Sequence, residues 1–211
     1  MDQREFDVRC EWGPRGLAGL SAVSSVVIVV DVLSFSTAVD IATSRGALVF
    51  PFPLQDGPAA DYASSLGAKL ASSKRNSGFS LSPNSLAAIP PDYRLVLPSP
   101  NGSALCFGAN CPNLLTGCLR NASAVADAAA RLGSTFAVIP AGETWPNGEL
   151  RPAFEDWVGA GSIIACLSGR ASPEAEMAVA AFEHFRGDLK TALRECQSGK
   201  ELIERGLTFV R

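Results

Sequence analysis

Strand-like and helix-like segments alternate along this chain of 211 residues. Val26–Val30 is a run of five β-branched residues, and a segment with helix-capping residues follows it from Ser34 to about Arg45. A run that is apolar at every position must be buried on both faces, as in a parallel sheet covered by helices. The alternation therefore predicts an α/β fold, a three-layer sandwich around a mainly parallel sheet, with residues 1–211 forming a single domain.

The remaining elements follow from short apolar runs separated by capping and turn residues. Further strands are expected at residues 47–52, 68–73, 93–98, 113–119 and 135–142. Further helices are expected at residues 56–67, 82–89, 101–108, 121–133, 154–169 and 172–187.

Composition limits the classes of protein that the chain can belong to. At 47% hydrophobic and 18% charged residues it can bury a sizeable core, and a net charge of −3 argues against a nucleic-acid-binding surface. The run Val26–Val30 is far shorter than the roughly 20 residues that span a bilayer, so no membrane association is expected. Six cysteines without a C-x-x-C pair indicate buried thiols in a reducing compartment, which predicts a cytoplasmic protein.

Polar residues follow three of the expected strands. Ligands of open parallel sheets bind beyond the carboxyl ends of the strands, so these residues are candidates for a site. They are Asp31 with Ser34, Ser36 and Thr37, then the turn Asn101, Gly102 and Ser103, and finally Gly142 and Glu143 with Glu155 and Asp156 at the next helix start.

The first of these segments has two interpretations. Hydroxyls and free N–H groups at a helix start can hold an anion, which a nearby carboxylate would repel. A hard cation such as Mg²⁺ between Asp31 and a phosphate would reconcile the two groups. Alternatively, Ser34 or Ser36 only caps the helix while Asp31 accepts hydrogen bonds from the same turn.

Four motifs in order resemble the 2-phosphosulfolactate phosphatase family. They are VVIVVDVLSFSTAV, LPSPNGSAL, GCLRNASAVA and IPAGETWPNGELRPAFEDWVGAG, and the similarity runs from about Glu11 to Leu167. The resemblance implies an α/β fold and an Mg²⁺-dependent phosphatase that releases sulfolactate and phosphate, a step toward coenzyme M. The expected ligand is a small anionic substrate, and a homo-oligomer is compatible with the sequence.

The resemblance also assigns residues. It implies catalytic and metal-binding roles for Asp31, Glu155 and Asp156. The motifs and the strand-end argument together predict a set of substrate-binding residues. They are Ser34, Ser36, Thr37, Arg75, Asn101, Gly102, Ser103 and Asn121.

The chain departs from the family pattern where two anion-binding arginines would stand. Ser34 and Ala104 occupy those positions, so the guanidinium of Arg75, Arg120 or Arg151 would have to replace them. These departures keep a second hypothesis open, a non-catalytic anion-binding protein derived from the family. A haloacid-dehalogenase-type phosphatase is disfavoured, because Leu33 stands where that class places its second acid.

Overall fold

The computed structural model describes residues 3–53, 57–74 and 77–206, and within them two parallel sheets are formed. The larger sheet has the order β1-β7-β2-β6, built from Val8–Cys10, Phe136–Pro140, Val26–Val30 and Leu114–Gly117. The smaller sheet has the order β3-β5-β4, built from Leu48–Phe52, Arg94–Pro98 and Lys69–Leu70. A short antiparallel hairpin pairs β8 (Glu143–Thr144) with β9 (Leu150–Arg151). The predicted α/β fold with mainly parallel strands is confirmed.

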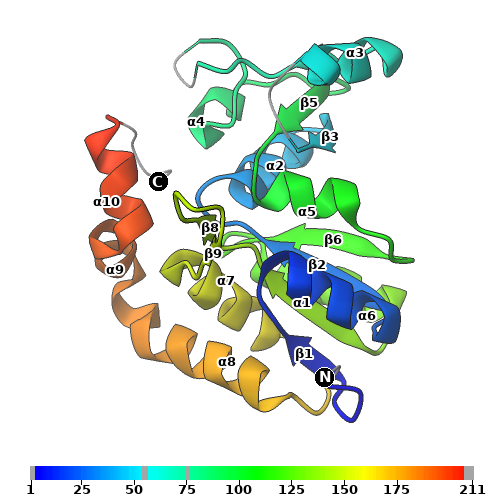
Figure 1. Cartoon of the computed structure of the whole chain (residues 1–211), viewed down its shortest axis with the longest axis vertical. Coiled ribbons are helices and arrows are strands. Elements are labelled where there is room, and N and C mark those ends of the chain that lie inside the picture. The colour runs from blue at the N-terminus through cyan, green and yellow to red at the C-terminus, as the bar shows by residue number, and fades with distance from the viewer. Residues whose placement is uncertain (1–2, 54–56, 75–76, 207–211) are drawn as a thin grey trace.

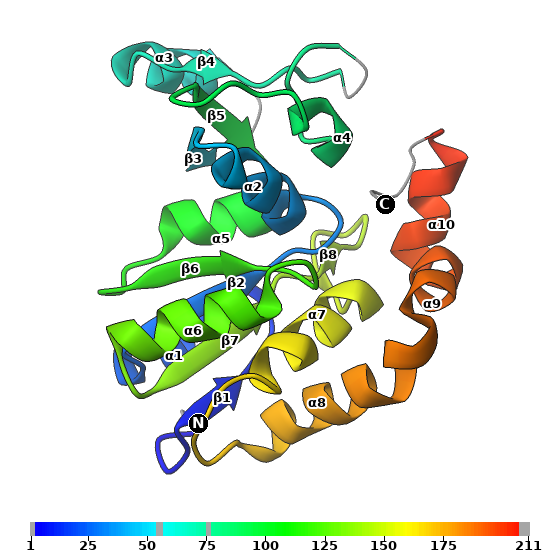
Figure 2. The same cartoon turned by 180° about the vertical axis from the view of Figure 1, so that it is seen from behind.

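Helices cover the larger sheet on both faces. The α-helices are α1 (Gly13–Leu20), α2 (Phe35–Ser44), α3 (Gly57–Ser65), α4 (Pro83–Leu86), α5 (Gly102–Gly108), α6 (Ala122–Leu132), α7 (Phe154–Ile164), α8 (Pro173–Phe185), α9 (Leu189–Glu195) and α10 (Gln197–Glu204). Helices α6, α7 and α8 lie on one face, and α2 and α5 lie between the larger and the smaller sheet (Figures 1 and 2). None of the helices in the described ranges is long and apolar enough to cross a membrane.

Strand β2 lies between β7 and β6 in the larger sheet, and both of its faces are apolar. Val26, Ile28 and Val30 belong to the core under α7 and α8, whereas Val27 and Val29 belong to the core under α1 and α5. Each fully buried aliphatic side chain of this size contributes roughly 1.5–3 kcal/mol relative to exposure. The strand is therefore held firmly in the middle of the larger sheet, and the loop after it starts from a fixed point.

The two ends of the chain contain elements that the sequence did not predict. Strand β1 is only Val8–Cys10 at the edge of the sheet, and α1 follows it with a proline in its first turn.

Toward the C-terminus, α8 begins where the sequence indicates, because Ser172 caps it by accepting the N–H of Ala175 at 3.2 Å. Helices α9 and α10 then turn back along the side of the molecule, where α10 contacts α7 (Figure 1).

All six cysteines are unpaired thiols in the structure. Cys10 and Cys118 are buried, three others are half-buried, and Cys166 is exposed. The expectation of buried thiols is therefore wrong for Cys166, which follows the end of α7 at the surface.

Candidate active site at the strand ends

Asp31 lies where the loop after β2 meets the starts of two helices. Its Oδ1 accepts the N–H of Phe35 at 3.1 Å, in the first turn of α2. Its Oδ2 accepts the N–H of Gly102 at 2.8 Å, in the first turn of α5. The Ser99 hydroxyl, in the loop after β5, is a further donor at 3.5 Å. One carboxylate thus caps two helices, and the side chain is almost fully buried.

Asp156 joins two neighbouring strand-end loops to the first turn of α7. Its Oδ1 accepts the N–H of Val32 at 2.7 Å, and its Oδ2 accepts the N–H of Gly142 at 2.9 Å. These donors follow β2 and β7, which are adjacent in the larger sheet. The predicted pair Asp31 and Asp156 is therefore brought to one place, although the two residues are far apart in the sequence.

Four acidic residues, Asp31, Glu143, Glu155 and Asp156, form what we call the carboxylate cluster. Burial raises the pKa of Asp31 and Asp156, and backbone hydrogen bonds oppose this change. The negative charges of Asp31 and Glu155 raise the pKa of Asp156 further. Burial also raises the pKa of Glu155 and of Glu143, which repel each other. The cluster concentrates negative charge that calls for a proton or a cation.

The cluster is not a preformed protein cage for a metal ion. Among the described residues, no three histidine, cysteine or acidic side chains are grouped so that they could hold a metal by themselves. Mg²⁺ does not need such a cage, because it usually binds one or two carboxylates and takes its other ligands from water and substrate phosphate. Asp31, Glu155 and Asp156 supply buried, mutually repelling carboxylates, and one or two of these hard oxygen donors would suffice for this mode of binding.

The hydroxyls of Ser36 and Thr37 are used in hydrogen bonds within the protein. The Oγ of Ser36 accepts the N–H of Asp31 at 3.0 Å and shares a hydrogen bond of 2.6 Å with the Oγ1 of Thr116 on β6. Thr37 donates its hydroxyl to the carbonyl of Val32 at 2.8 Å. Ser34 occupies the N-cap position of α2 without a side-chain cap, because the carboxylate of Asp31 takes that role. Their part in binding a substrate stays a prediction.

The turn Asn101, Gly102 and Ser103 has three separate functions in the structure. Asn101 donates its Nδ2 to the carboxylate of Glu143 at 2.9 Å, which links the loop after β5 to the start of β8. Ser103 is fully buried, donates to the carbonyl of Leu97 at 2.8 Å and accepts the N–H of Phe52 at 2.7 Å. Gly102 brings its backbone against Asp31, so the anion that this glycine approaches is a carboxylate of the protein itself.

We expect Gly102→Ala to destabilise the fold. A Cβ at this position would lie 2.7 Å from the Cβ and Oδ2 of Asp31 and 2.6 Å from the Phe35 ring, so the hydrogen bond to Asp31 must lengthen. The expected loss is about 1–3 kcal/mol in the free energy of unfolding, typical of overpacking a tight site. Urea unfolding measures it, and Gly108→Ala at the exposed end of the same helix is the matched control, since its Cβ would meet nothing within 4 Å. Equal stability of both variants would show that the contact with Asp31 is not tight.

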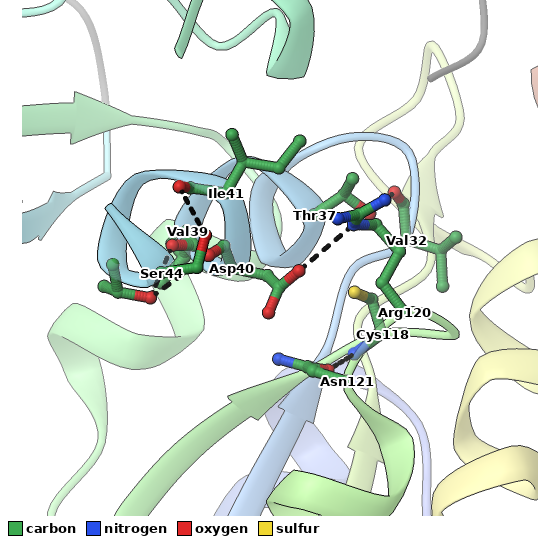
Figure 3. A network of polar contacts seen from close by, with 10 residues as sticks. Val32, Thr37, Val39, Asp40, Ile41, Ser44, Cys118, Arg120 and Asn121 are labelled. Carbon is green, nitrogen blue, oxygen red and sulfur yellow. Dashed lines mark hydrogen bonds and ion pairs between the residues drawn. The ribbon is translucent and has the colours of Figure 1, made fainter. Parts of the chain in front are cut away.

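Asn121 and Arg120 lie at the carboxyl end of β6, beside α2 (Figure 3). The Oδ1 of Asn121 accepts the N–H of Cys118 at 2.8 Å, which shapes the start of α6. Arg120 donates its Nε to Asp40 of α2 at 3.1 Å and is about half exposed. Both contacts lie within the protein, so a role for either residue toward an anion stays a prediction. Arg75, which the sequence analysis also named as a possible replacement for the missing arginines, lies outside the described residues.

The sequence analysis named Arg151 and Glu155 but not the C-terminal residues that contact them. Arg151 on β9 donates to Glu201 of α10 at 3.0 Å and lines a cavity of about 200 Å³ together with Glu155 and Ser198. The thiol of Cys196 also reaches the Oε2 of Glu155 at 3.6 Å, while burial raises the pKa of this thiol to about 11. No sequence motif predicts these contacts, since they join residues about forty or more positions apart.

The fold and the site together define an α/β protein with a carboxylate cluster at the carboxyl ends of parallel strands, the usual place for a ligand in such sheets. The chain belongs to the 2-phosphosulpholactate phosphatase family, whose model matches residues 16–209. It is 37% identical over 116 residues to the 2-phosphosulfolactate phosphatase of Methanothermobacter thermautotrophicus strain Delta H. That match includes 55% of this chain and 47% of the relative, so the chain covers about half the length of the relative.

Proposed function

We propose that the protein is an Mg²⁺-dependent phosphatase that hydrolyses 2-phosphosulfolactate or a related small phosphorylated hydroxy acid. The observation that carries the proposal is the position of Asp31 and Asp156. Asp31 follows β2 and Asp156 stands in the first turn of α7. Both are buried and both are fixed by backbone N–H groups at the carboxyl ends of the strands, in a chain that belongs to this family. Rigid carboxylates at this place suit a site that must hold charge in a set geometry.

One or two of the carboxylates of Asp31, Glu155 and Asp156 would hold Mg²⁺. When bound, the ion would neutralise the phosphate and stabilise the charge that develops in phosphoryl transfer. Backbone N–H groups of the protein orient two of these carboxylates. The N–H groups of Phe35 and Gly102 hold the Asp31 carboxylate in one orientation, and those of Val32 and Gly142 do the same for Asp156.

Arg151 is the basic residue best placed to assist with an anionic substrate. Its side chain is nearly buried, it lines the same cavity as Glu155, and it stands opposite Glu143 in the β8–β9 hairpin. Both arginines are paired, Arg151 with Glu201 and Arg120 with Asp40, but Arg120 lies at the half-exposed surface beside α2. This arrangement supports Arg151 over Arg120 as the replacement for the arginines that Ser34 and Ala104 displace.

A panel of phosphate monoesters, assayed with Mg²⁺ and with a chelator, tests the function. We expect release of inorganic phosphate from at least one phosphorylated 2-hydroxy acid, and loss of that activity when the chelator removes the metal. Saturable binding of phosphate or phosphoester without any turnover would instead support the alternative of a non-catalytic anion-binding protein. Turnover that is unchanged by the chelator would contradict the dependence on Mg²⁺.

The setting of the proposed reaction follows from the whole chain. With a net charge of −3 and cysteines that are all unpaired, the protein is proposed to act in the cytoplasm on a small molecule and without nucleic acid. On phosphosulfolactate the product would be sulfolactate, which leads toward coenzyme M.

A further inference from the structure

A cavity of about 490 Å³ lies beside the carboxylate cluster, between α1, α5 and the β8–β9 hairpin. Helix α1 contributes Leu17 and Ala18, α5 contributes Ala104 and Leu105, and the hairpin contributes Leu150. A volume in this range holds a ligand of substantial size, so a three-carbon phosphoester would leave part of the cavity unfilled.

The same two loops line the cavity and donate hydrogen bonds to the carboxylate cluster. In the loop after β5, Asn101 lines the cavity while the next residue, Gly102, donates to Asp31. In the loop after β7, Ala141 lines the cavity while the next residue, Gly142, donates to Asp156. Asn101 and Glu143 meet where the two loops join. A molecule whose phosphate lies at the cluster therefore has this cavity next to it for its organic part.

The lining disfavours an anion. Every lining residue belongs to the described part of the chain. Among them Glu143 is the one charged side chain, there is no lysine or arginine, and the neutral polar side chains are Ser21, Asn101, Asn110 and Thr144. Ala104, in the wall formed by α5, stands where the family pattern suggests an arginine. A sulfonate placed here would lose its hydration and face the carboxyl group of Glu143 without a cation to balance it, whereas an apolar group would gain from leaving water.

We propose that this cavity binds the organic substituent of the substrate and selects a bulky, uncharged, apolar group over a sulfonate. The inference rests on the proposed phosphatase function and specifies its substrate class. The enzyme would act on phosphate monoesters of 2-hydroxy acids whose third carbon carries an apolar group.

Two substrates that differ only in this substituent test the proposal. They are 2-phosphosulfolactate and the phosphate ester of 3-phenyllactate, which replaces the sulfonate by a phenyl ring. We expect kcat/KM for the phenyl compound to be about 10-fold higher or more, the range that a change of one group in an apolar pocket produces.

Two variants of the cavity wall test whether the cavity causes this substrate preference. Ala104→Arg places a guanidinium in the cavity and is expected to shift the ratio toward phosphosulfolactate by about 10-fold or more. Ala18→Trp, on the exposed face of α1, fills the cavity and is expected to lower kcat/KM for the phenyl compound more than for phospholactate. Ala124→Arg and Ala124→Trp on the exposed surface of α6 are the matched controls, for which no change in either ratio is expected.

The outcomes separate this inference from the proposed function. A preference for phosphosulfolactate that neither cavity variant alters would overturn the inference and leave the phosphatase function intact. If no ester is hydrolysed, calorimetry with the non-hydrolysable phosphonate analogues of the two compounds decides the matter. If the phenyl analogue binds more tightly than the sulfonate analogue and Ala18→Trp weakens that binding, the proposed role of the cavity is supported although the phosphatase function has failed. If the phenyl analogue binds equally or more weakly, both proposals are overturned.

Discussion

Asp31→Asn is expected to lower kcat/KM by about 10²–10⁴-fold on the best substrate of the panel, in the range for loss of a group that acts directly at the reacting centre. The substitution removes the negative charge at the centre of the carboxylate cluster. It also replaces one acceptor oxygen by an amide donor, which must face the N–H of Phe35 or of Gly102. Both the proposed metal site and the orientation of the side chain are lost together.

The fold is expected to survive this change. The unmade hydrogen bond costs about 1–3 kcal/mol, and relief of the buried negative charge offsets part of that cost. Urea unfolding of the variant measures the balance, and Asp127→Asn on the exposed face of α6 is the control for loss of a carboxylate away from the site. If Asp31→Asn keeps the wild-type kcat/KM, Asp31 neither binds metal nor contacts the substrate.

Mg²⁺ is expected to raise the Tm of the wild-type protein by about 5–10 °C when it is about 100-fold above its Kd. Binding at that ratio contributes about 2.7 kcal/mol, and a chain of this length gains roughly 2–4 °C per kcal/mol. The physical reason is the carboxylate cluster, whose mutual repulsion a divalent cation relieves. Asp31→Asn should lose most of the gain, while Asp127→Asn should keep it.

The gain should also depend on pH. Because the pKa values of Asp31, Glu143, Glu155 and Asp156 are raised in the folded state, the folded protein holds more protons than the unfolded chain once the pH exceeds about 4, where unfolded carboxyl groups titrate. Without metal, these groups therefore make the free energy of unfolding fall as the pH rises through their folded pKa values.

Mg²⁺ binds the deprotonated carboxylates, so its stabilising effect should grow over the same pH interval. Thermal unfolding between pH 5 and pH 8, with Mg²⁺ and with a chelator, measures both trends. An identical Tm with and without Mg²⁺ across this interval would contradict a metal site in the cluster.

Local patterns in the sequence were enough to predict the elements of the central fold. The β-branched run Val26–Val30 indicated a strand with both faces buried, and Ser172 followed by Pro173 marked the start of α8 correctly. It also named Asp31 and Asp156, since strand ends and helix starts of a parallel sheet are where ligands bind. Such features are local, because they depend on periodicity and capping within a few residues. That residues 1–211 form one domain stays a prediction.

The contacts that each of these residues makes depend on how the strands and helices pack together. Nothing local to Gly102 shows that it approaches Asp31, and nothing local to Asn101 pairs it with Glu143. These contacts depend on the order of strands in the sheet, and short apolar runs of similar composition do not encode which strand lies beside which. Because β7 lies next to β2, the N–H groups of Gly142 and Val32 converge on Asp156, and the strand-end carboxylates become one site.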